Sequence, residues 1–146
     1  AKLQARAAEQ GLEDRIIFMC KQDDVAQVIS LADLMLLPSE KESFGLVALE
    51  AMACGVPTIA STAGGLPELI SHGETGYLAP VGDTERMAQY ALELLTDDAR
   101  YRAFSEACIR RARSSFSSER IAMQYESVYY RVLGKTVNEL NPLCNT

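Results

Sequence analysis

Two glutamates, Glu42 and Glu50, lie eight positions apart around the start of a predicted helix. A continuously apolar segment ends at Pro38, a short loop follows, and helical periodicity begins near Ser43. The first turn of a helix carries N–H groups without acceptors and the positive end of the helix dipole, and both attract phosphate. Gly45 has no side chain that would keep an anion away from the main chain. These features alone are typical of many phosphate-binding proteins.

The spacing of the two glutamates narrows the kind of ligand. At about 1.5 Å per residue, eight positions of helix cover roughly 12 Å, a length similar to that of a sugar nucleotide. Carboxylates repel a diphosphate but accept paired hydrogen bonds from neighbouring hydroxyl groups. We therefore expect Glu42 to bind hexose hydroxyls and Glu50 to bind the ribose diol. A simpler interpretation treats them as a first-turn charge and a surface residue. Other candidates are Phe44, Gly45 and Leu46 for the donor sugar and Ser43, Phe44, Gly45 and Leu46 for the diphosphate.

Short apolar runs alternate with amphipathic stretches in most of the chain, a pattern typical of parallel strands joined by helices. The expected fold class is α/β, with a Rossmann-like parallel sheet and flanking helices. The predicted N-cap of one helix is Asp83. Strands are predicted at 15–20, 33–38, 58–60 and 76–79, and helices at 2–10, 24–31, 44–54, 66–71 and 83–95.

Two further helices, 98–114 and 118–133, follow with no strand between them. Apolar side chains recur at spacings of three or four residues in both, which predicts faces that pack in the core. For the second helix, an aromatic binding surface is the less favoured interpretation. The apolar residues are Tyr101, Phe104, Cys108 and Ala112 in the first helix and Ile121, Tyr125, Val128, Tyr129 and Val132 in the second.

The composition limits the classes of partner. The 146 residues include 14 basic and 20 acidic side chains, and the net charge of −6 argues against binding to nucleic acid phosphates. We expect the cluster Arg110, Arg111 and Arg113 to form the solvated face of a helix. No apolar run approaches the roughly 18 residues of a membrane span, and no secretory leader is visible. The four cysteines are scattered without a C-x-x-C pair, which favours neither a zinc site nor disulfides, so a reducing cytoplasm is the simplest expected location.

The segment ESFGLVALE, residues 42–50, resembles the E-x7-E motif of the retaining GT-B glycosyltransferase family. The resemblance extends over about 15–133 and includes ADLMLLPS before the motif, EAMACGVPTIAS after it, and then GGLPELI and HGETGYLAPVGD. In that family the first glutamate contacts the donor sugar and the second contacts the ribose, in agreement with the geometric interpretation. The run KQDDVAQVISLADLMLLPSEKESFGLVALEAMACGVP and the later MQYESVYYRVL are most similar to the branch that transfers N-acetylglucosamine from UDP to L-malate in bacillithiol biosynthesis.

The resemblance implies a nucleotide-sugar donor, UDP-N-acetylglucosamine in that branch, with no cofactor and no metal ion, because family members use no metal-binding D-x-D motif. Transfer retains the anomeric configuration without an agreed protein nucleophile, so we assign no catalytic residue. Base recognition is expected in the loop after 15–20, where main-chain atoms near Cys20 and Lys21 are candidates; an ordinary strand-to-helix loop is the alternative. The pair Gly64-Gly65 either borders the donor or forms a simple tight turn.

A GT-B enzyme contains two Rossmann-like domains, and the resemblance covers only the C-terminal, donor-binding one. We expect 1–96 to be part of that domain without its first strands, 97–133 to be helices that pack on it, and 134–146 to be a tail. The expected partners are the nucleotide sugar and an N-terminal acceptor domain of the same protein. The chain alone is expected to have an exposed sheet edge and little transferase activity. The acceptor and the formation of a homo-oligomer stay open.

Two other functions fit parts of the pattern. A non-catalytic nucleotide-sugar-binding or protein-binding module would keep the same fold without the chemistry. A nicotinamide-binding Rossmann domain is disfavoured, because no G-x-G-x-x-G sequence follows a predicted strand.

Overall fold

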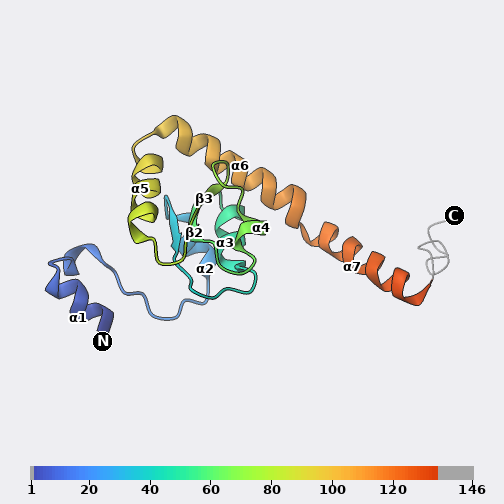
Figure 1. Cartoon of the computed structure of the whole chain (residues 1–146), viewed down its shortest axis with the longest axis horizontal. Helices are drawn as coiled ribbons and strands as arrows, with labels where there is room; N and C mark the ends of the chain where they lie inside the picture. Colours follow the sequence, from blue (N-terminus) through green and yellow to red (C-terminus); the bar gives the residue numbers. More distant parts are fainter. Residues whose placement is uncertain (1, 135–146) are drawn as a thin grey trace.

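Three short parallel strands form the centre of the molecule, shown in Figure 1 as a computed structural model that describes residues 2–134. The strands are β1 (Met35–Leu37), β2 (Thr58–Ser61) and β3 (Gly76–Ala79), in the spatial order β1-β2-β3. Leu36 lies opposite Ile59, and Ile59 lies opposite Tyr77. The predicted α/β fold with a parallel sheet is confirmed, as are the strands expected at 33–38, 58–60 and 76–79.

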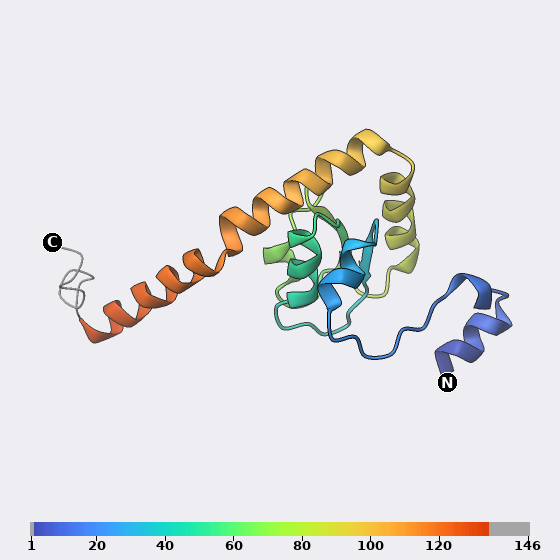
Figure 2. The same cartoon turned by 180° about the vertical axis from the view of Figure 1, so that it is seen from behind.

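Helices surround the sheet and extend toward both ends of the chain (Figures 1 and 2). Four of them begin with a side chain that accepts a hydrogen bond from the N–H group three residues further on, and the predicted cap Asp83 is one of these. The helices are α1 (Lys2–Glu9), α2 (Val25–Ser30), α3 (Leu46–Ala53), α4 (Leu66–Leu69), α5 (Thr84–Leu95), α6 (Asp98–Phe116) and α7 (Ser118–Leu133), with a short 3-10 helix η1 (Glu13–Arg15).

The hydrophobic core lies on both faces of β2. Ile59 and Ala60 are fully buried neighbours on this strand and point to opposite faces of the sheet. Ile59 packs with side chains of β3, α5 and α6, whereas Ala60 packs with side chains of α3, α4 and α6. Helix α6 contributes to both clusters, through Phe104 on one side and Cys108 on the other. The packing face predicted for 98–114 is therefore confirmed.

The strand predicted at 15–20 is wrong. Residues 16–22 have no regular secondary structure, and the side chain of Ile17 is 87% exposed. A strand is stable only when its main-chain groups pair with a neighbour. Within residues 2–134, β1 pairs with β2 alone, and no other strand lies beside residues 16–22. Figure 2 shows this segment leading away from the sheet toward α1.

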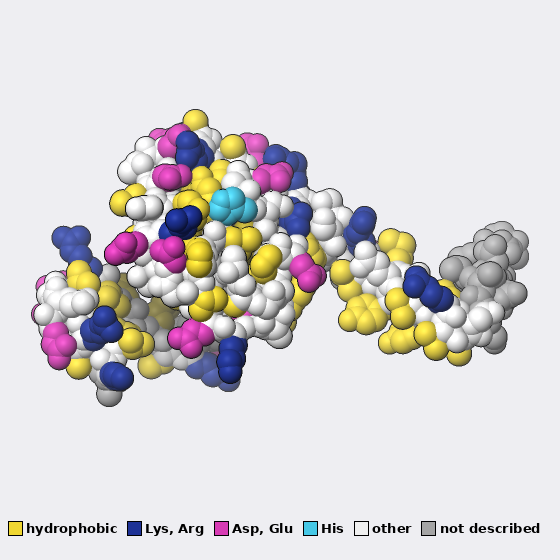
Figure 3. All heavy atoms as spheres, in the orientation of Figure 1, with side chains coloured by type: hydrophobic (Ala, Val, Ile, Leu, Met, Phe, Trp, Pro, Cys, Tyr) yellow, Lys and Arg dark blue, Asp and Glu magenta, His cyan; other side chains and the backbone are white. Residues whose placement is uncertain are grey.

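The core packing predicted for 118–133 is also wrong. Helix α7 contains no buried residue, and Val132 is 79% exposed. Figure 1 shows the helix extending away from the sheet, and Figure 3 shows apolar side chains along it. Its apolar spacing indicates a face that can be covered, but no element within residues 2–134 covers it. The helix ends at Gly134, which adopts a left-handed conformation; the rest of the predicted tail lies outside the described residues.

None of the helices between residues 2 and 134 is both long enough and apolar enough to cross a membrane.

Candidate donor site at the start of helix α3

The loop between β1 and α3 contains the predicted donor-site residues. Strand β1 ends at Leu37, and α3 starts at Leu46, slightly later than the sequence predicts. Gly45 is the N-cap residue of α3 and has a φ of 91°, which a residue with a Cβ rarely adopts. A Cβ at this position would also lie 2.6 Å from Cδ2 of Leu66. The glycine therefore permits both the turn into α3 and the close packing of the loop on α4.

The main chain at this helix start offers free hydrogen-bond donors. The carbonyl oxygen of Gly45 accepts from the N–H groups of Ala48 and Leu49, which starts the helical pattern. The N–H groups of Phe44, Gly45 and Leu46 have no acceptor in the described part of the chain. These donors and the helix dipole create a positive potential at the start of α3. The arrangement can bind an anion.

The carboxylate of Glu42 is turned back toward its own loop. Its Oε1 atom accepts a hydrogen bond from the N–H of Ser43 at 3.0 Å, and its Oε2 atom lies 3.5 Å from the hydroxyl oxygen of Ser39. The residue is half-buried. Ser43 is one of the predicted diphosphate-binding residues, and its N–H group is therefore already hydrogen-bonded to Glu42.

Sequence reasoning missed Ser39 and Ser61. The hydroxyl group of Ser61 donates to the carbonyl oxygen of Ser39, and Ser39 in turn reaches Glu42. Ser39 follows β1 and Ser61 ends β2, so both lie at the carboxyl edge of the parallel sheet. Ligands of open α/β sheets bind at this edge. A search for polar residues at the ends of adjacent predicted strands would have identified the pair.

The second glutamate, Glu50, lies on α3 and is exposed. No hydrogen bond or ion pair holds its carboxylate within residues 2–134. Glu50 and Glu42 thus belong to one helix and the loop that precedes it, and they do not contact each other. Glu50 is free to accept hydrogen bonds from a ligand.

The pair Gly64-Gly65 packs against the loop from the side of α4. The N–H group of Gly65 donates to the carbonyl oxygen of Ser43 at 3.1 Å. A Cβ at Gly64 would lie 1.6 Å from the carbonyl oxygen of Glu42, so no other residue fits there without moving the loop. The pair therefore contacts the main chain of the candidate donor loop directly. Whether it borders the donor or forms only a tight turn stays a prediction.

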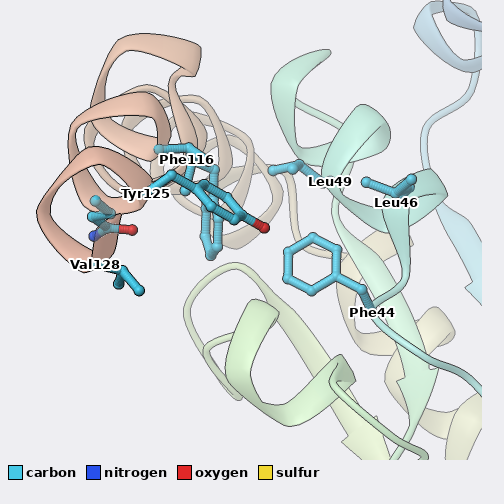
Figure 4. A pocket seen from close by; sticks show the side chains of 8 residues that line it. Phe44, Leu46, Leu49, Phe116, Tyr125 and Val128 are labelled. Carbon is cyan, nitrogen blue, oxygen red and sulfur yellow. The ribbon is translucent and has the colours of Figure 1, made fainter. Parts of the chain in front are cut away.

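A mostly apolar pocket of about 590 Å³ lies on the other side of the loop (Figure 4). It lies between the start of α3 and helix α7, and neither Glu42 nor Glu50 lines it. The rings of Phe44 and Phe116 meet edge to face, with their centroids 6.2 Å apart. Because its lining is apolar, the pocket does not match a diphosphate. The side chains that line it are Phe44, Leu46, Leu49, Phe116, Ile121, Gln124, Tyr125 and Val128.

The structure does not bring Cys20 and Lys21 to this loop. Both are exposed in the irregular segment that follows η1, and the side chain of Gln22 donates to the carbonyl oxygen of Cys20. Figures 1 and 2 both show this segment leaving the sheet. Their role in base binding stays a prediction.

Comparisons with known proteins assign the chain to a family. Residues 1–113 match the family described as "Glycosyl transferases group 1". The chain belongs to this family of glycosyltransferases, and the resemblance based on the segment ESFGLVALE is confirmed.

Individual relatives agree with this assignment. The N-acetyl-alpha-D-glucosaminyl L-malate synthase of Bacillus anthracis is 54% identical over 122 residues, which cover 84% of this chain and 32% of that protein. A sucrose-phosphate synthase from Thermosynechococcus elongatus has a TM-score of 0.84 and 36% identity, over 91% of this chain and 34% of that one. The Anabaena protein HepE, solved in complex with UDP-glucose, has a TM-score of 0.78 and 30% identity, over 86% of this chain and 36% of that one. The chain spans about a third of the length of these proteins.

Proposed function

We propose that the loop before α3 binds the diphosphate sugar donor of a glycosyltransferase, and that this donor is UDP-N-acetylglucosamine. The observation that supports this most is the group of free N–H donors at Phe44, Gly45 and Leu46, between two carboxylates. Family membership and the similarity to a protein solved with UDP-glucose support a nucleotide-sugar ligand. The 54% identity to an N-acetylglucosaminyl malate synthase supports the choice of sugar and, in the whole protein, L-malate as acceptor.

In this proposal the donor lies along the start of α3. The diphosphate accepts hydrogen bonds from the three free N–H groups, each of which contributes about 1.5–3 kcal/mol because the acceptor is charged. The ribose diol donates to Glu50, and the hexose hydroxyls donate to Glu42. When Glu42 turns to the sugar, it releases the N–H of Ser43, which then becomes a further donor for the diphosphate.

The same N–H groups have a role in the transfer step. When the glycosidic bond to the diphosphate breaks, negative charge develops on the leaving phosphate, and donors that are already aligned stabilise it. The protein is thus proposed to transfer the sugar with retention of the anomeric configuration and without a metal ion. No residue of this chain is assigned as nucleophile or base.

Calorimetric titration with UDP and UDP-N-acetylglucosamine tests donor binding in this chain. Replacement of Glu50 by Ala removes the ribose contacts and is expected to lower the affinity for both ligands by about tenfold or more. Replacement of Glu42 by Ala is expected to lower the affinity for UDP-N-acetylglucosamine and to leave the affinity for UDP nearly unchanged. Glu40→Ala, an exposed carboxylate in the same loop, is the matched control. Equal affinities in all three variants and the unmodified chain would refute the site.

A second experiment tests the reaction. In a chimaera, this chain replaces the matching third of the Bacillus anthracis relative, and formation of N-acetylglucosaminyl malate from UDP-N-acetylglucosamine and L-malate is measured. Product formation that requires Glu42 supports the proposed enzyme. Donor binding without any turnover in a folded chimaera would instead indicate a non-catalytic nucleotide-sugar-binding module.

A further inference from the structure

Arg111 does not belong to the solvated arginine face that the sequence predicts. Its guanidinium group donates from Nε to the carbonyl oxygen of Leu69 and from Nη2 to that of Glu68, both at 2.8 Å. Arg111 is half-buried, whereas Arg110 and Arg113 on the same helix are exposed. The prediction is therefore wrong for Arg111 alone.

The two carbonyl groups lie at the end of α4, which is only four residues long. The last carbonyl groups of a helix receive no hydrogen bond from within the helix. An arginine at this end can donate hydrogen bonds to them and interacts favourably with the negative end of the helix dipole. Arg111 thereby ties α4 to α6. The apolar side chains of Leu66 and Leu69 are fully buried in the same contact region.

The other end of α4 contacts the candidate donor loop. The N–H of Gly65 donates to the carbonyl oxygen of Ser43, and Gly64 lies against the carbonyl group of Glu42. One short helix therefore connects the guanidinium group of Arg111 with the main chain that carries Glu42.

A second set of contacts reaches the same loop. The central carbon of the Arg111 guanidinium lies 5.7 Å from the ring centroid of Phe116, and the ring of Phe116 meets that of Phe44 edge to face. Figure 4 shows Phe44 and Phe116 as lining residues of the same pocket. Arg111 thus supports the loop at Glu42 and Ser43 through α4, and at Phe44 through Phe116.

We infer that Arg111 is a positioning residue that holds Glu42 in place for the donor sugar. This inference rests on the proposed function, in which Glu42 binds the hexose and Glu50 binds the ribose. Glu50 belongs to α3, which packs mainly on α6 and has a smaller contact with α4. Loss of the Arg111 contacts should therefore disturb the sugar end of the site more than the nucleotide end.

The test compares Arg111→Ala with Arg110→Ala, a matched control that removes the same charge one position away. Amide hydrogen exchange, measured by NMR without ligand, is expected to be about tenfold faster or more at Gly65 in Arg111→Ala, because a pair of charge-assisted hydrogen bonds is lost. Exchange at Ile59 and Tyr77, in β2 and β3, should stay as in the unmodified chain. Arg111→Ala should also lower the affinity for UDP-N-acetylglucosamine relative to UDP by about threefold or more.

A purely structural role would reduce the affinities for UDP and UDP-N-acetylglucosamine by the same factor. Unchanged exchange at Gly65, or an equal loss for both ligands, would overturn the inference. The exchange measurement needs no ligand, so it stands even if Glu42→Ala refutes sugar binding by that residue. If amide exchange in β2 and β3 is also faster in Arg111→Ala, the measurement is repeated with Arg111→Lys. Lysine cannot donate in the same two directions, so exchange at Gly65 should still accelerate; exchange equal to that of the unmodified chain would reject the inference.

Discussion

The thiol of Cys108 donates a hydrogen bond to the carbonyl oxygen of Thr75, with 3.1 Å between sulfur and oxygen. Cys108 is fully buried on α6, in a cluster with side chains of α3 and α4. Burial raises the pKa of this thiol to about 12. Because the thiolate is the reactive form, Cys108 should be chemically protected in the folded chain.

Thiol labelling tests this protection. With a disulfide reagent at pH 8, Cys20 is expected to react within seconds to minutes because it is exposed, and Cys108 only after unfolding. Mass spectrometry of the proteolysed chain identifies the labelled residues. Labelling of Cys108 at the rate of Cys20 in the folded chain would contradict the burial described above.

The raised pKa also predicts how stability depends on pH. The unfolded chain loses the thiol proton near the ordinary pKa of about 8.5, whereas the folded chain retains it up to about pH 12. The unfolded state therefore binds fewer protons in this interval, and the free energy of unfolding falls as pH rises through it. Burial also raises the pKa of Tyr101, which acts in the same direction.

Urea unfolding at pH 8 and pH 10 measures this effect. Cys108→Ala removes the titrating thiol and should make the decrease between the two pH values smaller, although the variant is less stable at both. An equal decrease in the two proteins would indicate that Cys108 does not contribute.

Gly64 should tolerate no side chain without loss of donor binding. In Gly64→Ala the new Cβ would overlap the carbonyl oxygen of Glu42, and the residue has a φ of 52°. We expect the conformational strain to cost about 1 kcal/mol and the displaced loop to reduce UDP-N-acetylglucosamine affinity by about tenfold or more. Gly73→Ala is the control, since Gly73 has a φ of 80° but nothing within 4 Å of the added Cβ. If the two variants lose the same affinity, the contact with Glu42 is not responsible.

Removal of the hydroxyl groups of Ser61 and Thr58, both on β2, should affect the free energy of unfolding differently. Ser61 donates to the carbonyl oxygen of Ser39, so Ser61→Ala leaves a part-buried carbonyl unpaired and should destabilise the fold by about 1–3 kcal/mol. The buried hydroxyl of Thr58 has no partner within the described residues. Thr58→Val keeps the shape and should leave stability unchanged or raise it by about 1 kcal/mol.

Thermal and urea unfolding of both variants provide the comparison. A loss of stability in Thr58→Val as large as that in Ser61→Ala would show that Thr58 makes a hydrogen bond in solution.

The elements whose stabilising contacts are close in sequence could be predicted. Apolar runs bounded by Pro or Gly predicted β1, β2 and β3, and Asp83 predicted a helix start through a contact only three residues away. The candidate donor loop was predicted for the same reason, because an N-terminal helix turn has the same free N–H groups in any fold.

The errors concern contacts that no local pattern contains. The segment 15–20 has the composition of a strand, but pairing depends on a neighbour that the local sequence does not specify. The spacing in α7 indicates an apolar face without indicating what covers it. Arg111 bonds with carbonyl groups 42 and 43 positions away, and nothing in the run Arg110, Arg111 and Arg113 distinguishes it.

The outer side of β1 has a consequence for self-association. In parallel pairing, alternate residues direct their N–H and C=O groups to opposite sides of the strand. The N–H of Met35 donates to the carbonyl oxygen of Pro57, on the side of β2. Within this three-residue strand only the main-chain groups of Leu36 therefore point outward, and the next outward position is Pro38, which has no N–H group. A strand of another molecule could therefore pair with only one N–H donor of β1, whereas a longer edge strand has several. The edge is thus a poor template for growth of an amyloid-like sheet.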